Sequence, residues 1–132
     1  MTAPFHGLKV VDLTTVVVGP YCTQLLSDMG ADVTKVEAPD GDMTRLGAPK
    51  RDGSLSSTFL QLNRNKRAIT LDLKQPDAAA AMHKLIAEAD VFVHNMRPEP
   101  LARLGFDYDK VSVYNPNICL LYTSPSPRDM WT

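Results

Sequence analysis

Two segments of the sequence concentrate basic side chains that could bind phosphate groups. The first, NRNKRAITLDLK, contains Arg64, Lys66, Arg67 and Lys74 around a short apolar run. These side chains suit two roles, because they can cover apolar surface with their charges in water or can hold an anionic ligand. Strand direction supports the ligand role for Lys74, which follows the carboxyl end of the predicted strand 68–73, where parallel sheets bind ligands.

The second segment, HNMRPEPLARLGF, places an amide and guanidinium groups after another predicted strand. Asn95 follows the strand, Arg97 precedes a proline that fixes the turn, and Arg103 is expected on a short helix. Arginines at a strand end can bind phosphate in a forked geometry, or they can cap backbone carbonyls and pair with Glu99. Both interpretations stay open. His94, which ends the strand, is expected to be a hydrogen-bonded structural histidine.

The remaining reactive residue types predict structural roles. Asp12 lies in an apolar strand pattern, so we expect it to be buried and hydrogen-bonded. His6 and His83 are expected at the surface. Without a paired-histidine motif or an acidic cluster, the sequence predicts no metal site. Cys22 and Cys119 are far apart and are expected to be free thiols that pack as small buried hydrophobic residues.

The composition is that of an ordinary soluble domain. The chain has 132 residues, of which 44% are hydrophobic, and a net charge of −1, so we expect one domain or a piece of one. A nearly neutral chain predicts no binding to nucleic acid or to an anionic membrane surface. The amino terminus lacks a signal-peptide pattern, and no apolar run approaches the ~20 residues that span a bilayer. We therefore predict a cytoplasmic protein.

Alternating strand and helix patterns position these residues. Apolar and β-branched runs predict parallel strands at 8–13, 32–37, 68–73 and 90–95. Helical spacing predicts helices at 21–29 and 76–89, with another beginning at 98. Residues 38–55 show no sustained period and are expected to form a long loop. The fold class predicted is α/β, a Rossmann-like parallel sheet with flanking helices.

The turn after the first strand lacks a dinucleotide fingerprint. TTVVVGP contains the single glycine Gly19, so NAD or FAD binding through G-x-G-x-x-G is not expected. Helix amides at such a turn can still receive an anion. Pro20 suits the start of the helix that follows, and Gly30 suits its end. We expect the apolar face of this helix to pack on the sheet: Cys22, Leu25, Leu26 and Met29.

Three segments together resemble the amino-terminal part of the class III coenzyme A transferases. They are GLKVVDLTTVVVGPYCTQLLSDMGADVTKVEAPDGDMTR, NRNKRAITLDLK and VFVHNMRPEPLARLGF, and the resemblance covers about residues 5–119. That family includes formyl-CoA transferase, carnitine CoA-transferase and the α-methylacyl-CoA racemases. The resemblance implies a larger protein whose Rossmann-like domain binds CoA and whose two identical subunits interlock into a homodimer.

The resemblance also implies a set of CoA-binding residues at the carboxyl edge of the sheet. Val17 and Val18 would lie beside the thiol arm and the acyl group. Contacts with the nucleotide and its phosphates are implied for Leu71, Asp72, Leu73, Lys74, Asn95, Met96, Arg97 and Arg103. Some transferases carry a basic residue at the position of Ala38 and a glutamine at that of Val17. By this resemblance, the chain is not expected to make one of the family's phosphate contacts and its polar contact on the acyl side.

The resemblance implies an activity whose catalytic residues lie downstream of the matching segments. In the transferases an aspartate attacks the acyl-CoA thioester, and CoA moves to a carboxylic acid acceptor. In the racemases a histidine and an aspartate move the α-proton instead. We therefore name no catalytic residue in this chain. An acyl-CoA racemase is the alternative within the family, and a fragment that only binds CoA or is inactive is a second alternative.

The carboxyl-terminal residues do not continue the α/β pattern. After NPNIC the chain reads LLYTSPSPRDMWT, in which LLYTSPSPRD resembles a translated sequencing-adaptor read-through. We expect residues 1–119 to be the amino-terminal part of a CoA-binding domain and residues 120–132 to be a non-native tail.

Overall fold

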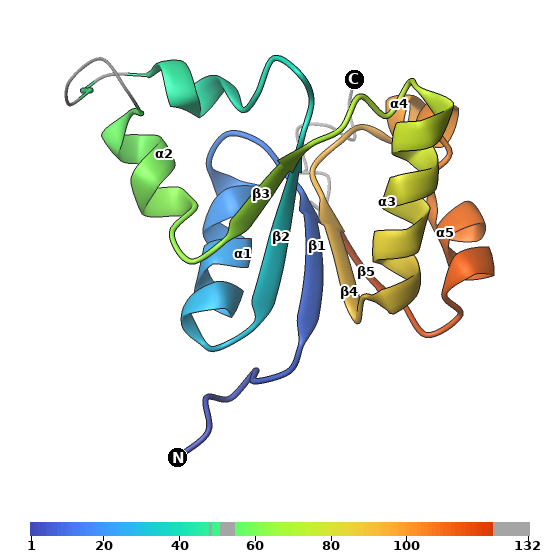
Figure 1. Ribbon diagram of the computed structural model, residues 1–132, viewed down its shortest axis with the longest axis horizontal. Helices are drawn as coiled ribbons and strands as arrows, with labels where there is room; N and C mark the ends of the chain where they lie inside the picture. Colours follow the sequence, from blue (N-terminus) through green and yellow to red (C-terminus); the bar gives the residue numbers. More distant parts are fainter. Residues whose placement is uncertain (48, 51–54, 123–132) are drawn as a thin grey trace, which may run out of the picture.

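Five parallel strands form one sheet in the computed structural model, which describes residues 1–47, 49–50 and 55–122 (Figure 1). The strands are β1 Lys9–Leu13, β2 Asp32–Glu37, β3 Arg67–Thr70, β4 Val91–His94 and β5 Cys119–Tyr122. Their order is β3-β2-β1-β4-β5, and every pairing is parallel. The predicted α/β class and parallel sheet are confirmed.

Helices cover both faces of the sheet. They are α1 Val18–Asp28, η1 Met43–Leu46, α2 Ser57–Leu62, α3 Pro76–Glu88, α4 Pro98–Leu104 and α5 Tyr108–Tyr114. On one face Val10, Val33 and Val93 form a small core with Leu26 of α1. On the other face, strand residues that include Phe92 join a larger core with α3, α4 and α5. Alternating strand residues therefore point to opposite helix layers, as in a doubly covered parallel sheet.

The predicted apolar face of α1 is only partly correct, because Leu26 packs on the core but Leu25 and Met29 do not. Leu25 and Met29 are 38% and 40% exposed, whereas the helix buries a largely polar face: Gly19, Pro20, Thr23, Gln24 and Ser27. Of the other predicted residues, Cys22 and Leu26 are half-buried. The reason is the buried carboxylate of Asp12 beneath α1, to which Thr23 Oγ1 donates a hydrogen bond of 2.6 Å. A helix over a buried charge must offer it polar groups.

The region 38–55 contains more order than the predicted loop. Asp42 caps the 3₁₀ turn η1 by accepting a hydrogen bond from the Thr44 amide, and Lys50 bridges to Ser56. Ser56 caps α2, because its Oγ accepts a hydrogen bond of 3.0 Å from the Phe59 amide. The part of the prediction that concerns residues 48 and 51–54 lies outside the described residues.

The edges of the sheet differ from the predicted strands. β3 ends at Thr70 rather than at residue 73, and all four of its residues are exposed because it lies at one edge. β5 forms the other edge and runs across the boundary predicted after residue 119, with Leu120 opposite Phe92. A non-native tail at 120–132 stays a prediction, and residues 123–132 lie outside the described part.

Two predicted side-chain environments need correction. Both cysteines are free, but Cys119 is exposed on the edge strand and Cys22 is half-buried, so neither is the buried residue predicted. His83 is half-buried rather than at the surface, and its ring stacks on that of Tyr114 with centroids 4.0 Å apart. His6 is exposed, as predicted.

Candidate functional site

The carboxyl ends of the strands meet at the upper edge of the sheet in Figure 1, where the β1–α1 loop lies. Because β1 is central, this loop is flanked by the ends of β2 and β4. Asn95, which follows β4, donates from Nδ2 to the Thr15 carbonyl (2.8 Å) and accepts from the Thr15 amide (3.1 Å). The structure thus brings one predicted site residue, Asn95, against the loop, where it bonds to the backbone amide and carbonyl of Thr15.

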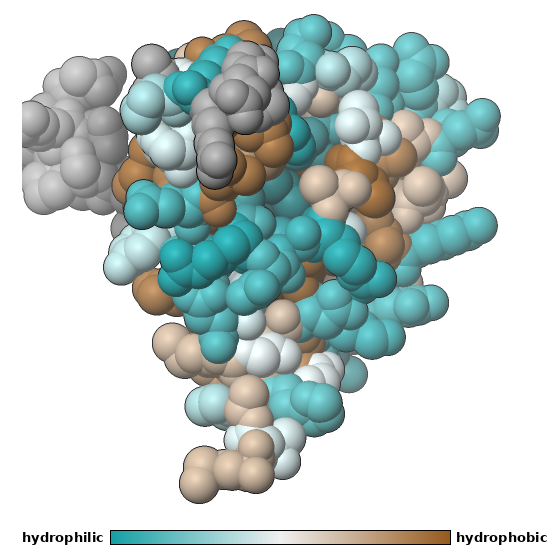
Figure 2. Space-filling model, turned by 60° about the vertical axis from the view of Figure 1, so that its left-hand side comes forward, coloured by the Kyte–Doolittle hydropathy of each residue, from teal (hydrophilic) through white to brown (hydrophobic). Residues whose placement is uncertain are grey.

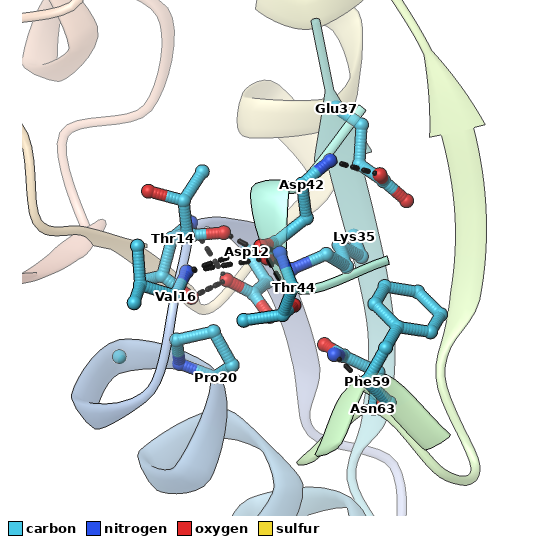
Figure 3. Close-up of polar contacts among 12 residues, drawn as sticks. Asp12, Thr14, Val16, Pro20, Lys35, Glu37, Asp42, Thr44, Phe59 and Asn63 are labelled. Carbon is cyan, nitrogen blue, oxygen red and sulfur yellow. Dashed lines mark hydrogen bonds and ion pairs between the residues drawn. The ribbon is translucent and has the colours of Figure 1, made fainter. Parts of the chain in front are cut away.

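A buried ion pair holds the same loop from the other side (Figure 3). Lys35 and Asp42 have side chains that are 0% exposed, with Lys35 Nζ 2.9 Å from Asp42 Oδ2. Lys35 Nζ also donates to the Thr14 carbonyl at 3.1 Å. The Val16 amide lies 3.3 Å from each carboxylate oxygen of Asp42. The pair therefore satisfies one acceptor and one donor of the loop backbone.

These contacts hold a strained backbone. Val16 has a φ of 72°, in the left-handed region that a β-branched residue rarely adopts. Such a conformation costs about 1–3 kcal/mol and persists only where the surroundings determine it. Gly19 adds a close approach, because a Cβ there would lie 2.4 Å from Thr14 Cβ. The loop before α1 is thus fixed in shape and tightly packed against its own strand end.

A second buried ion pair lies beneath α1. Lys66 Nζ lies 3.1 Å from Asp12 Oδ2, with side chains 1% and 0% exposed, and also donates to the Pro20 carbonyl at 2.9 Å. Burial lowers the pKa of Lys66, although the Asp12 carboxylate opposes that change. The buried, hydrogen-bonded role predicted for Asp12 is confirmed. Lys66 joins α1 to the segment before β3, and its side chain is closed off from solvent.

A third pair continues the network outward. Arg45 donates to Glu37 from Nε (2.8 Å) and from a terminal nitrogen (2.6 Å), and its guanidinium lies 4.0 Å from the Phe59 ring centre. Burial raises the pKa of Glu37, but hydrogen bonds from Arg45 and from the Asp42 amide outweigh it, so that the pKa is lowered. The pKa of Asp42 is lowered in the same way, by bonds from Thr44 and Lys35 that exceed the effect of burial.

The structure divides the predicted basic patch. Arg64 pairs with Asp28 at 2.6 Å and Arg67 pairs with Asp32 at 2.7 Å. Asp28 ends α1 and Asp32 begins β2, so both pairs lie toward the amino-terminal edge of the sheet. With Lys66 buried, only Lys74 of the predicted patch remains exposed at the carboxyl edge.

The other residues predicted to contact CoA lie in segments that are anchored in one hydrophobic core. Leu71, Leu73, Met96 and Leu104 pack against the same core between the sheet and α3–α5. Lys74, Arg97 and Arg103 each adjoin one of these anchors in sequence and are exposed. In the described part of the chain, no ion pair involves these three residues. The structure thus joins the segments after β3 and β4 through their apolar residues and leaves their cations in solvent.

The remaining predicted residues complete this edge. Val17 and Val18 are 46% and 72% exposed at the start of α1. Asp72 is half-buried, and its carboxylate accepts from the Lys74 amide at 3.2 Å. His94 is buried below this edge. Burial lowers the pKa of its imidazole, although a hydrogen bond with the backbone of Met96 acts in the opposite direction. The predicted hydrogen-bonded histidine is therefore found at one ring nitrogen only, since Nδ1 has no hydrogen-bond partner within the residues described.

Sequence reasoning missed the pair that holds the loop. Neither Lys35 nor Asp42 was expected to contribute, although a lysine in the middle of DVTKVE was the available signal. A charged residue at the centre of an apolar strand must find a buried partner. Among residues 1–47, 49–50 and 55–122, no group of three or more histidine, cysteine or acidic residues could hold a metal, and no helix is long and apolar enough to cross a membrane.

Comparison with known proteins identifies the family of this arrangement. Residues 5–124 match the model of CoA-transferase family III. The chain belongs to this family. The sequence is 41% identical over 122 residues to a succinyl-CoA–L-malate CoA-transferase beta subunit of Chloroflexus aurantiacus, covering 91% of this chain and 30% of the relative. It is 46% identical over 122 residues to a formyl-CoA:oxalate CoA-transferase of Rhodopseudomonas palustris, covering 89% of this chain and 28% of the relative.

A solved family structure shows the same fold. A CaiB/BaiF family protein from Brucella suis superposes with a TM-score of 0.87 at 36% identity, over 95% of this chain and 36% of the other. The family resemblance and the fold that it implied are therefore confirmed. This chain spans about a third or less of the length of the proteins that it matches.

Proposed function

We propose that this chain is the CoA-binding portion of a CoA-transferase, which moves CoA from an acyl-CoA to a carboxylic acid. Family membership supports CoA chemistry, and the relatives described above bear the names of CoA-transferases. No observation specifically favours the racemase alternative. A CoA-binding or inactive fragment remains the alternative for this chain when it acts alone.

The exposed cations of the carboxyl edge carry the proposal. CoA has three phosphate groups, and Lys74, Arg97 and Arg103 are exposed beside one apolar anchorage without an ion-pair partner in the described residues. Other basic residues, such as Arg64 and Arg67, are engaged in ion pairs. Charge-assisted bonds from lysine and forked bonds from arginine suit phosphate oxygens. We assign the nucleotide end of CoA to this side of the edge.

The β1–α1 loop is assigned to the other end of CoA. Val17 and Val18 offer exposed apolar surface suited to the thiol arm and the acyl group. Leu71, Asp72 and Leu73 line the path to the nucleotide, together with Asn95 and Met96. These assignments follow the family resemblance and the common edge on which the residues lie.

The chemical step is assigned to residues beyond those that match here. In the proposed reaction an aspartate carboxylate attacks the thioester carbonyl, so that an acyl anhydride forms and CoA thiolate leaves. The thiolate then attacks the aspartyl carbonyl, releasing the donor acid and leaving an aspartyl thioester, which the acceptor acid opens by the reverse steps. The chain described here would hold CoA during both exchanges. We further propose an interlocked homodimer located in the cytoplasm.

Calorimetric titration of this chain with CoA tests the proposal. Lys74→Ala and Arg103→Ala are each expected to weaken CoA binding about tenfold, because each removes a charge-assisted contact of roughly 1.5 kcal/mol or more. Lys84→Ala is the matched control, since Lys84 is exposed on α3 and outside the proposed site. Unchanged affinity in both site variants would refute these phosphate contacts, and no binding by the wild-type chain would refute CoA binding by this portion.

A further inference from the structure

We propose that the buried Lys35–Asp42 pair positions the acyl end of the CoA site by fixing the left-handed turn at Val16. This inference rests on the proposed function, and it assigns a role to residues that are too deeply buried to touch a ligand. Both side chains are 0% exposed, so their effect on binding must pass through the β1–α1 loop. They are positioning residues.

The contacts of the loop make this role specific. Asp12 accepts a hydrogen bond from the Thr14 amide, and Lys35 donates to the Thr14 carbonyl. Asn95 bonds to both backbone groups of Thr15. Asp42 accepts from the Val16 amide. Side chains from separate parts of the chain therefore fix every backbone polar group from the Thr14 amide to the Val16 amide.

At Val16 these contacts hold the backbone in a left-handed conformation, against the preference of valine for an extended one. Without Asp42, its amide loses the acceptor that draws it inward, and its φ of 72° has no other described bond to maintain it. A valine then relaxes to an extended conformation. Val17 and Val18 follow directly, so the relaxation moves the first amides of α1 and the apolar surface that is assigned to the acyl end.

The nucleotide end is built independently of this pair. Its cations adjoin Leu73, Met96 and Leu104, which pack on the core beneath α3–α5. None of these anchors contacts Lys35 or Asp42 through a described hydrogen bond or ion pair. Loss of the pair is therefore expected to affect the two ends of the ligand differently. Binding of the acyl end should weaken, whereas binding of the nucleotide should stay unchanged.

The test compares acetyl-CoA with adenosine bisphosphate, the nucleotide end of CoA, by calorimetric titration of the 132-residue chain. Lys35→Met combined with Asp42→Leu removes both charges together, so that neither is left buried alone, and it also removes the acceptor of the Val16 amide. We expect acetyl-CoA affinity to fall about tenfold, because a loop that must be ordered on binding costs affinity of that order. Adenosine bisphosphate affinity is expected to stay within about twofold.

Val16→Gly provides the readout that a merely structural role would not produce. Glycine adopts positive φ without strain, so it is expected to recover part of the lost acetyl-CoA affinity in the neutralised variant and to change little in the wild type. The matched control neutralises an exposed pair instead, with Arg67→Gln and Asp32→Asn, and is expected to bind both ligands as the wild type does.

The outcomes separate this inference from the proposed function. Selective loss of acetyl-CoA affinity with recovery through Val16→Gly supports positioning by the pair. Unchanged acetyl-CoA affinity, an equal loss for both ligands, or no recovery with glycine overturns it while leaving CoA binding intact. A wild-type chain that binds neither ligand overturns the proposed function, and the positioning role falls with it.

Discussion

Replacing Lys35 alone with methionine tests the energetics of the buried network. The methionine fills most of the same volume, but the Asp42 carboxylate then loses a cation at 2.9 Å and the Thr14 carbonyl loses a donor at 3.1 Å. Breaking a buried ion pair from one side costs about 3–5 kcal/mol, since an uncompensated charge remains in the interior. A domain of ordinary stability has only about 5–15 kcal/mol in total. We therefore expect the Lys35→Met chain to fold but to be clearly destabilised.

Urea unfolding followed by circular dichroism measures this loss. With a slope of about 2 kcal/mol per molar urea, a loss of about 4 kcal/mol lowers the midpoint by about 2 M. The Lys35→Met, Asp42→Asn double variant is expected to recover much of that stability, because no lone charge remains buried. Arg67→Gln, at a pair whose side chains are 71% and 50% exposed, is expected to cost less than about 1 kcal/mol.

Comparing the unfolding free energies of these variants tests whether Lys35 and Asp42 form a buried ion pair. A loss of under about 1 kcal/mol for Lys35→Met would show that water or a rearranged partner compensates Asp42, as at an exposed pair. A double variant less stable than Lys35→Met alone would show that removing the Asp42 charge does not relieve the loss, so that the two residues do not act as a pair. Either result would refute the placement of a buried ion pair under the loop.

Two further predictions concern the same edge. Gly19→Ala should destabilise the chain by about 1–3 kcal/mol in thermal or urea unfolding, because the new Cβ meets Thr14 at 2.4 Å, whereas an unhindered helical glycine would gain stability with alanine. A stabilised Gly19→Ala chain would contradict that close packing. The second prediction concerns pH. Because the pKa values of Glu37 and Asp42 are lowered in the folded chain, each ionised carboxylate stabilises the fold at a pH above its unfolded-state pKa. This stabilisation is lost as the pH falls through the folded-state pKa. The free energy of unfolding should therefore fall on acidification below about pH 5, and more shallowly in Glu37→Gln, whereas equal pH slopes in the two chains would count against the Glu37 contribution.

Local patterns were sufficient to predict the framework. β2 has the bounds predicted from DVTKVE, and α3 begins at Pro76 as proline and aspartate in its first turn indicate. The strand-to-helix alternation also predicted that Asn95 and Lys74 follow the carboxyl ends of strands, where the structure has them. These features depend on side-chain periodicity and chain direction, which a sequence displays directly.

Long-range charge pairing was not predictable in the same way. The apolar spacing of α1 indicated that Leu25 and Met29 face the sheet, but the buried Asp12–Lys66 pair takes that position and turns them outward. Figure 2 shows the side of the molecule that bears α1 and α2, where apolar patches lie among hydrophilic ones. The partners in this pair are separated by 54 positions, and no local period reports which buried charges will meet. The division of the basic patch has the same cause.

The hydrogen bonds of Asn95 to Thr15 connect residues 80 positions apart, and this separation has a consequence during protein synthesis. At roughly 5–20 residues per second, a ribosome needs about 4–16 seconds to progress from one partner to the other. The loop before α1 is thus translated early but acquires its last support only when β4 has emerged. A nascent chain stalled before that point would carry a first helix preceded by a turn that still lacks its two bonds to Asn95, so the ligand-facing edge is expected to mature after much of the surrounding framework.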